Sequence, residues 1–422
     1  MKHSLRLLAL VCALLLCVIP FSACGEKNDS ETVEPPVISI DTDDVAITTK
    51  ESYVAAKIST SNTEDEFILT DEAAEVRLRG NYSLKPDKKS YRIKFKTKQN
   101  LFGQDIGAAR TWVLIANFCD KTLLRNYLAY HMASKLDGLD YTTSAGLVEV
   151  NVNGEYQGLY LLAEQTQIGE TRVNVEEGSE EPNTGYLVEL DRYLTEDKDP
   201  SDVDFRVNNI PYAIKNDVFN EAQRTYIENC MQTAFAAVQS GDRTQIETYI
   251  DLDSCIDMYI MHEYFKNPDA GYSSFYFFKP KDGKIHFGPA WDFDLGAGND
   301  QRMDNGDPHG AFTGVATHMT WLENHWFTTL MTYPWFKSAV QARWQEILPI
   351  VDETIELATE MTEKYRPAID RNFEKWPIYG TKQNQEPEHV AAMKTAEEHL
   401  EYLTDWMTKR KTWFSLYLGG LV

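Results

Sequence analysis

The sequence predicts an α+β fold of two lobes, a β-rich N-terminal lobe over residues 38–216 and an α-rich C-terminal lobe over residues 217–422. Short runs of alternating apolar and polar residues between turn residues dominate the first half. Longer runs, with apolar residues three and four positions apart, dominate the second half. Strands that precede helices rather than alternate with them indicate an α+β arrangement, and the cleft between the lobes is the expected site.

The β-rich half contains seven strand candidates and one helix, which is expected over residues 121–136. Asn153-Gly154 separates the last two strands and is a strong signal for a tight hairpin turn. The acidic stretch 176–204 is expected to be a loop-rich surface insertion. The strands are expected at residues 46–49, 53–59, 74–79, 91–95, 112–116, 147–152 and 156–164.

The α-rich half begins with a helix over residues 220–239, in which Ile227, Met231 and Ala234 share one apolar face. A second helix is expected to be capped by Asp253 and to end before Pro268. Further helices are expected at residues 335–348, 352–365 and 390–418.

The first 23 residues have the pattern of a secretory signal peptide. A charged start precedes an apolar stretch, residues 7–19, that is too short for a membrane span. Cys24 follows Ser22 and Ala23 directly, an order that resembles a bacterial lipoprotein signal. Residues 24–37 would then form a flexible tether. We therefore expect a cell-envelope protein, anchored to a bacterial membrane through lipidated Cys24 and exposed to the periplasm or the cell surface.

The chain is strongly acidic, with a formal net charge of −24, which argues against nucleic acid as a partner. Three cysteines follow the tether, Cys119, Cys230 and Cys255, and they show no CxxC spacing. Neither a disulfide framework nor a zinc site is therefore expected.

Three carboxylates flank a predicted β-hairpin in the helical half. Asp269 precedes a strand-like run over residues 274–279, and the return strand over residues 284–287 leads into Asp292 and Asp294. A hairpin brings its open ends together, so Asp269 and Asp292 are expected to be neighbours. Clustered carboxylates in a partly apolar setting usually bind a divalent cation or transfer a proton. The alternative is that these aspartates only cap turns.

A basic island interrupts the acidic sequence and suggests a polyphosphate ligand. Residues 77–98 contain nine Lys and Arg residues and one acidic residue, Asp87. Arg79-Gly80-Asn81 lies between two strands, where glycine permits a close backbone approach to a ligand. Cations on one lobe and carboxylates on the other favour polyphosphate bound through a metal. No GxxxxGK[ST] motif is present, so a nucleotide would have to be held as protein kinases hold it.

In a protein-kinase cleft, a strand lysine contacts phosphate and is positioned by a glutamate, one aspartate orients the acceptor hydroxyl, and another binds Mg²⁺. Lys94, Glu164, Asp269 and Asp292 occur in that order along this chain. Glu164 could equally be a surface residue at the end of its strand.

Eight sequence blocks between Arg77 and Asp300 resemble the CotH family of spore-coat protein H, a family of atypical secreted protein kinases. The resemblance implies a divergent protein-kinase-like fold that uses ATP with Mg²⁺ or Mn²⁺ to phosphorylate serine or threonine of extracytoplasmic proteins. The blocks are RLRGNYS, KKSYRIKF, LFG, WVLIANFCDKTLLRN, VNGEYQGLYLLAEQ, YAIK, NPDAGYSSFYFF and FGPAWDFDLGAGND.

The resemblance also assigns roles to individual residues. Asp269 in NPD is similar to the catalytic aspartate of the family, and Asp292 in WDFD to its metal ligand, with Asp294 as a helper at the metal. The nucleotide-side candidates are Arg79, Lys94 and Glu164, and Lys89 competes with Lys94 for the phosphate-contacting role.

The sequence departs from the kinase pattern at one position. Kinases place an asparagine five residues after the catalytic aspartate, where this chain has Ser274. Asn299, Asp300 or Asp294 would then supply the missing contact, or only one metal would bind. Two other functions stay open, a non-catalytic surface module for binding or adhesion, and a glycosidase that uses Asp269 and Asp292 as its carboxylate pair.

Overall fold

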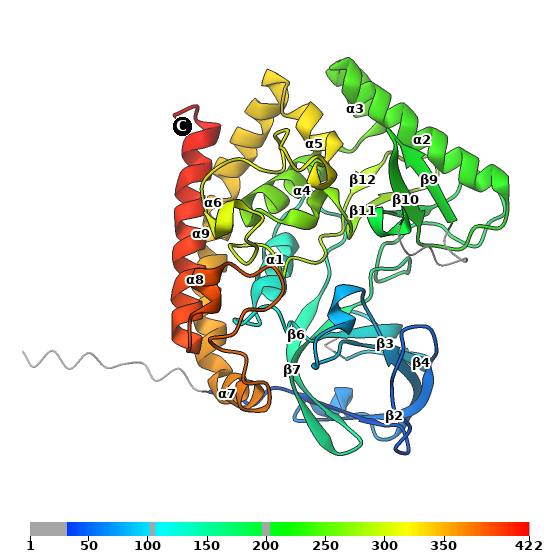
Figure 1. Ribbon diagram of the computed structural model, residues 1–422. Helices are drawn as coiled ribbons and strands as arrows, with labels where there is room; N and C mark the ends of the chain where they lie inside the picture. The colour runs from blue at the N-terminus through cyan, green and yellow to red at the C-terminus, as the bar shows by residue number, and fades with distance from the viewer. Residues whose placement is uncertain (1–31, 102–105, 196–202, 422) are drawn as a thin grey trace, which may run out of the picture. The chain divides into compact units, whose positions relative to one another are not determined.

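The first half of the chain forms a closed β-barrel, in the strand order β1-β2-β3-β4-β5-β7-β6 (Figure 1). A β-rich half was expected, but its closure into a barrel was not. Parallel pairing of β1 with β6 closes the barrel, and β6 and β7 form the hairpin expected at Asn153-Gly154. The strands are β1 (Val37–Asp41), β2 (Val54–Ser61), β3 (Glu72–Leu78), β4 (Tyr91–Gln99), β5 (Ala109–Ile115), β6 (Ala145–Val152) and β7 (Glu155–Glu164).

The computed structural model describes residues 32–101, 106–195 and 203–421. The predicted signal peptide, residues 1–23, and the lipidated Cys24 lie outside the described residues. Within the described ranges, no helix has the length and apolarity needed to cross a membrane.

Alternation along each strand fills the barrel with its own core. Ile93, Phe95 and Trp112 are buried inside it, whereas Lys94 and Lys96 on the same strand as Ile93 are exposed. The predicted strand over residues 46–49 is wrong, because these residues belong to no β-ladder. A strand that was not predicted, β1, precedes them in the chain. Helix α1 (Arg125–Ser134) lies between β5 and β6 and is shorter than expected.

A second sheet, ordered β12-β11-β8-β10-β9, joins strands from both halves of the sequence. Its central strand, β8 (Tyr186–Leu190), corrects the prediction of a loop-rich insertion over residues 176–204, because all five of its residues are buried. Its partners are β9 (Val203–Val207), β10 (Ile210–Ile214), β11 (Phe275–Lys279) and β12 (His286–Phe287). Antiparallel pairing of β11 with β12 confirms the predicted hairpin.

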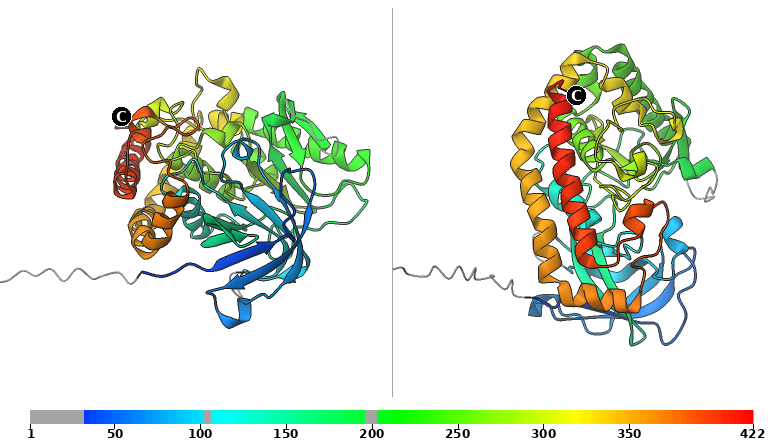
Figure 2. Two further views of the ribbon diagram at one scale, coloured as in Figure 1. Left: turned by 60° about the horizontal axis from the view of Figure 1, so that its bottom comes forward. Right: turned by 60° about the vertical axis from the view of Figure 1, so that its left-hand side comes forward.

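Helices make up most of the second half, as expected. Helices α6 and α9 run side by side (Figures 1 and 2). The α+β fold class is thus confirmed. The helices are α2 (Glu221–Ser240), α3 (Arg243–Tyr249), α4 (Leu252–Phe265), α5 (His325–Leu330), α6 (Pro334–Lys364), α7 (Arg366–Lys375), α8 (Glu388–Ala391) and α9 (Ala396–Leu418).

Three helix boundaries differ from the prediction. Residues 335–348 and 352–365 form one helix, because Pro349 is exposed and water can replace the hydrogen bond it removes. The segment 390–418 is divided by Thr395, which makes a capping box with Glu398 and starts α9. Helix α4 is capped by Asp251 rather than Asp253.

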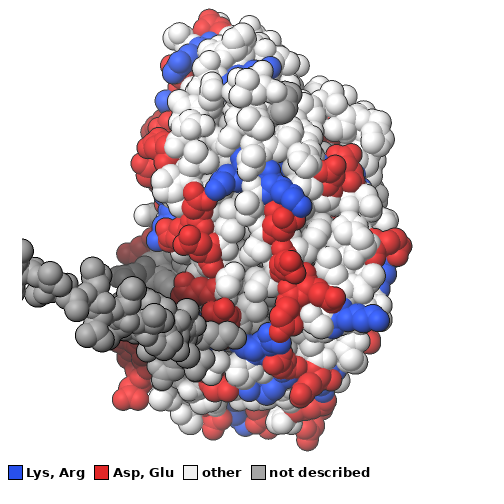
Figure 3. Space-filling view, turned by 90° about the vertical axis from the view of Figure 1, so that its left-hand side faces the viewer, with Lys and Arg blue, Asp and Glu red and all other residues white. Residues whose placement is uncertain are grey.

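The segment before β1 lies against the helical half. Val33 N donates a hydrogen bond to the Lys364 carbonyl at 2.9 Å, and Glu34 forms an ion pair with Arg371. Figure 3 shows this side of the molecule, where acidic side chains outnumber basic ones. Helices α6 and α9 both carry exposed acidic side chains, among them Glu353 on α6 and Glu401 on α9.

Candidate active site

Asp269 lies just beyond the C-terminus of α4, in the short 3₁₀ turn Pro268–Gly271. Lys266 ends the helix in a left-handed conformation, with φ of 48°. Asn267 then caps the turn, because its Oδ1 accepts a hydrogen bond from Asp269 N at 3.1 Å. Proline is favoured at the first position of such a turn, where its missing N–H would have no partner. The sequence Lys-Asn-Pro-Asp therefore stops the helix and fixes the backbone of Asp269.

Asn267 also links Asp269 to Asp292. Its buried Nδ2 donates a hydrogen bond to the Asp292 carbonyl oxygen at 2.9 Å. Ser274, which stands where kinases have asparagine, donates from Oγ to Asp292 Oδ2 at 3.3 Å. The structure thus brings the two open ends of the hairpin together, as expected.

Helix α1 holds the backbone around Asp292. Asp292 N donates to Tyr130 Oη at 3.3 Å, and Phe293 N donates to Asn126 Oδ1 at 2.6 Å. Trp291 stacks on Tyr130 with ring centroids 5.7 Å apart. Asp292 itself has φ of 63°, a left-handed conformation that is uncommon outside glycine and is concentrated at functional sites.

The three aspartates are half-buried, and the pKa of each carboxyl is raised. Burial and then the charge of Asp292 raise the pKa of Asp269 to about 8. Burial also raises the pKa of Asp292, and burial with the charges of Asp292 and Asp269 raises that of Asp294 well above its usual range. Their mutual effect indicates one electrostatic cluster, and perturbed carboxyls in such a cluster are functional-site candidates.

Asp294 keeps a carboxylate that no described residue engages as a hydrogen-bond donor. The side chains of the other two alternatives for a second metal contact are held in place by hydrogen bonds or an ion pair. Asn299 Nδ2 donates to the Cys119 and Asp294 carbonyls at 2.9 and 2.8 Å. Asp300 is fully buried and paired with Arg302.

Arg79 brings the basic island to the aspartates. Its guanidinium carbon lies 5.5 Å from the centre of the Trp291 ring. Its positive charge acts against the rise in the pKa of Asp292. The neighbouring charges of Arg77 and Arg79, together with burial, lower the pKa of Arg92. Arg79, which directly follows β3 of the barrel, therefore faces the carboxylates of the helical half.

The family model for the CotH kinase protein matches residues 76–414. The chain belongs to the CotH kinase family. No match was found among curated proteins. The family is one of atypical kinases, and kinase chemistry implies the use of ATP.

Lys94 and Glu164 were the candidates for the lysine–glutamate pair of a kinase site. Lys94 is exposed on the barrel, with its Nζ 5.7 Å from the centre of the Tyr53 ring. Glu164 is buried and forms an ion pair with Arg172, and its Oε2 accepts hydrogen bonds from Tyr141 Oη at 3.0 Å and Ser144 N at 2.9 Å. The structure does not bring Lys94 and Glu164 together.

Lys89, the alternative to Lys94, closes its own loop. Its Nζ donates to the carbonyls of Leu84 at 2.7 Å and Pro86 at 2.6 Å. Lys88 is buried and donates to the Ala116 carbonyl and to Asn372 Oδ1, so it joins the barrel to α7. Neither lysine extends toward the aspartates of the CotH site.

Glu189 and Lys215 form an ion pair beside Asp292 that the sequence analysis missed. Lys215 Nζ lies 3.0 Å from Glu189 Oε2, and Ser274 N donates to Glu189 Oε1 at 3.1 Å. The charge of Glu189 also raises the pKa of Asp292. The block YAIK, which ends at Lys215, was the available signal, but Glu189 lies in the stretch taken for a loop.

The described residues contain no group of three or more His, Cys, Asp or Glu side chains arranged to hold a metal ion. Carboxylate oxygens are nevertheless the donors that Mg²⁺ prefers, and Mg²⁺ is usually bound through one or two carboxylates plus substrate phosphates. Asp292 and Asp294 fit that donor set.

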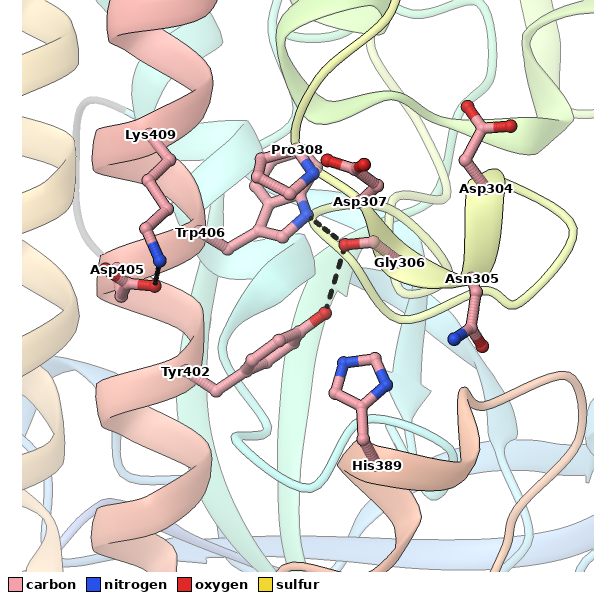
Figure 4. A pocket seen from close by; sticks show the side chains of 10 residues that line it. All are labelled: Asp304, Asn305, Gly306, Asp307, Pro308, His389, Tyr402, Asp405, Trp406 and Lys409. Carbon is pink, nitrogen blue, oxygen red and sulfur yellow. Dashed lines mark hydrogen bonds and ion pairs between the residues drawn. The ribbon is translucent and has the colours of Figure 1, made fainter.

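A pocket of about 320 Å³ lies between residues 304–308 and α9, and none of the predicted site residues lines it (Figure 4). The Gly306 carbonyl in its wall accepts hydrogen bonds from Trp406 Nε1 at 2.7 Å and Tyr402 Oη at 3.3 Å. Two of its three carboxylates have cationic partners, since Asp304 pairs with Lys266 and Asp405 with Lys409, and the third, Asp307, accepts a hydrogen bond from His309 N at 2.8 Å.

Proposed function

We propose that the protein is an ATP-dependent kinase that transfers the γ-phosphate to serine or threonine hydroxyls of extracytoplasmic proteins. The observation that carries the proposal is the cluster of Asp269, Asp292 and Asp294, in which Asn267 links the first two and which Arg79 faces. Cations opposite carboxylates suit a polyphosphate, and they favour this function over that of a glycosidase. The barrel and the helical half would correspond to the two lobes of a divergent protein-kinase-like fold.

In this proposal Asp269 orients the acceptor hydroxyl and accepts its proton. A pKa raised to about 8 suits a proton acceptor that works near neutral pH. Arg79 binds phosphate oxygens from the barrel side. Mg²⁺ or Mn²⁺, when held by Asp292 and Asp294, supplies charge neutralisation at the phosphates.

The proposed setting is the cell envelope, with the protein anchored to a membrane through lipidated Cys24. The signal-like first 23 residues and the polar tether support this location. Mass spectrometry of the protein purified from bacterial membranes tests it, since a lipid-modified Cys24 at the N-terminus is expected and an intact residue 1 would contradict it.

Phosphoryl transfer from γ-labelled ATP to a casein-type acceptor, with Mg²⁺ or Mn²⁺, tests the activity. We expect incorporation by the wild type, loss of at least a hundredfold in Asp292→Ala, and no change in the exposed control Asp405→Ala. Equal incorporation by wild type and Asp292→Ala would refute the mechanism. If ATP with Mn²⁺ neither transfers phosphate nor raises the melting temperature, the chain is a non-catalytic surface module instead.

A further inference from the structure

Arg302 is held rigidly in the segment that follows Asp294. Its Nε lies 3.0 and 2.9 Å from the two carboxylate oxygens of Asp300, and its Nη2 donates to Oδ2 of the same group. Asp300 Oδ1 also accepts a hydrogen bond from the backbone N of Arg302 at 2.7 Å. On the other side, the guanidinium carbon lies 5.8 Å from the centre of the Trp321 ring. A buried carboxylate and an aromatic ring thus fix the guanidinium plane.

This clamped arginine adjoins the turn that carries Asp269. Trp321 packs edge-on against Tyr272 with ring centroids 5.6 Å apart, and Tyr272 N donates to the Asp269 carbonyl at 3.0 Å. The turns Pro268–Gly271 and Thr320–Leu322 touch at their backbones, since a Cβ on Gly271 would lie 2.3 Å from the Leu322 carbonyl oxygen. The positive charge of Arg302 accordingly acts on Asp269, where it opposes the rise in pKa.

Phosphoryl transfer requires positive charge around the transferring group, because charge spreads over its three equatorial oxygens. The loop 267–274, which carries Asp269, contains no lysine or arginine. Arg79 approaches from the side of Trp291 and Asp292. Two cations lie on the side of Tyr272: Arg192, whose Nε donates to the Gly271 carbonyl at 2.8 Å, and Arg302, which is the one whose charge acts on Asp269.

The contacts of the Arg302 guanidinium leave one of its edges, at Nη1, for a ligand. The bonds to Asp300 use Nε and Nη2, and no described residue accepts a hydrogen bond from Nη1. The side chain is 22% exposed, whereas its partner Asp300 is fully buried. A purely structural role, the neutralisation of Asp300, would not require this exposed edge.

We propose that Arg302 binds the transferring phosphoryl group on the acceptor side of Asp269, and that Asp300 and Trp321 position it. This inference rests on the proposed kinase function. The acceptor oxygen forms its bond to the γ-phosphorus while the bond from that phosphorus to the bridging oxygen breaks. ADP leaves with that oxygen, and the hydroxyl proton passes to Asp269. Arg302 keeps its proton and stabilises the charge of the transferring group.

Steady-state kinetics of Arg302→Met and Arg302→Lys test the inference. We expect Arg302→Met to lower kcat by about 10²- to 10³-fold with little change in KM for ATP, because the contact belongs to the transition state. Arg302→Lys keeps the charge but loses the planar fork, so an intermediate kcat is expected. Arg243 is a matched control, since it is also held by a carboxylate, Glu247, and lies over a tryptophan, Trp335, but on the exposed helix α3. Arg243→Met should keep the wild-type kcat.

A binding measurement separates a role in the reaction from a role in folding. ADP with Mg²⁺ should raise the melting temperature of wild type and Arg302→Met equally, whereas the further rise on adding aluminium fluoride, which imitates the transferring group, should be lost in Arg302→Met. An equal aluminium fluoride effect or an unchanged kcat in both Arg302 variants would overturn the inference while the kinase function stands. If Arg302→Met fails to fold, Arg302→Lys decides by the same two readouts. Absence of transfer and of any ADP effect in the wild type would defeat both proposals.

Discussion

Glu263, in the last turn of α4, and Asp269, just beyond that helix, are neighbouring carboxylates in opposite environments. Glu263 is fully buried and receives hydrogen bonds from the backbone N of Phe312 at 2.9 Å and of Thr313 at 2.6 Å. Arg410 Nη2 adds an ion pair at 2.8 Å. The carboxylate of Asp269 is half-exposed, lies near other carboxylates, and receives no hydrogen bond from the described residues.

The difference shows how one short piece of chain carries both a carboxylate that stabilises the fold and one that the fold leaves unsatisfied. Glu263 and Arg410 hold the segment after Asp294 against α4, since Arg410 Nη1 also donates to the Pro308 and Gly310 carbonyls at 2.8 Å. A satisfied carboxylate stabilises the scaffold, whereas an unsatisfied one stays available for a substrate proton or a cation. The fold therefore fixes the surroundings of Asp269 and leaves its carboxylate without a hydrogen-bond donor among the described residues.

The largest effect is expected from removing the charge of Asp269. Asp269→Asn should lower kcat for phosphoryl transfer by about 10³- to 10⁴-fold, because the amide cannot accept the acceptor proton. Affinity for ATP with Mn²⁺, measured by calorimetry, should change by less than about threefold, since the proposed role of Asp269 is a contact with the acceptor hydroxyl rather than with ATP. A variant that keeps a tenth of the wild-type kcat would place the proton acceptor elsewhere.

Glu263→Gln tests whether the buried pair of Glu263 and Arg410 stabilises the fold. It leaves Arg410 buried without a carboxylate, which should lower the free energy of unfolding by about 3–5 kcal/mol in urea denaturation. Glu353→Gln, an exposed ion-paired residue on α6, should change the same quantity by less than about 1 kcal/mol. Similar losses in the two variants would mean that the buried network does not stabilise the fold.

His262, on the same helix, is buried like Glu263 and, like Asp269, has a side chain without hydrogen-bond partners among the described residues. It lies between Phe275 and Phe293, each 4.9 Å away by ring centroids, and neither ring nitrogen has a hydrogen-bond partner among the described residues. Burial lowers its pKa from 6.5 to about 3. Between these two pKa values the imidazole is protonated in the unfolded chain and neutral in the folded protein. The free energy of unfolding should therefore fall as pH drops from 6.5 toward 3.

By pH 5 this difference costs the wild type about 2 kcal/mol of unfolding free energy relative to pH 7. His262→Phe should reduce the loss by that amount in denaturant titrations at the two pH values. The exposed His318→Phe should leave it unchanged. Equal acid sensitivity of His262→Phe and wild type would show that the imidazole is protonated inside the fold.

The smallest effect concerns the stability cost of the carboxylate cluster. Because the pKa of Asp294 is raised in the folded state, its ionised form opposes folding, and the cost grows as pH rises above the unfolded value. Asp294→Asn should raise the unfolding free energy at pH 8, without metal, by up to about 1 kcal/mol. It should also weaken stabilisation by Mn²⁺ with ATP. Lower stability of the variant at pH 8 would contradict this account.

Local sequence signals predicted the parts of the site that depend on local geometry. The two strand-like runs over residues 274–279 and 284–287 were sufficient to predict the hairpin, and hence the approach of Asp269 to Asp292. Alternation along β4 agrees with the exposed position of Lys94. It could not tell which residue from another strand lies opposite, so the partner of Glu164 was missed.

Features that depend on long-range burial could not be predicted in this way. The strand β8 is short and lies in an acidic stretch, so only its place at the centre of a sheet reveals it. Lys88 and Lys89 are adjacent cations in the sequence, but packing against α7 buries the first and not the second. The role proposed for Arg302 depends on Asp300 being fully buried, which no sequence pattern indicates.

The parallel pairing of β1 with β6 has a consequence for how the protein is made. Val37 is synthesised early, yet its partner Glu149 follows only after all the other strands of the barrel except β7. One edge of β1 can pair with β2 as soon as that strand is made, but its other edge must wait for β6, and non-local pairings of this kind slow folding. A chain trimmed beyond Val37 would leave the edge of β6 open to self-association.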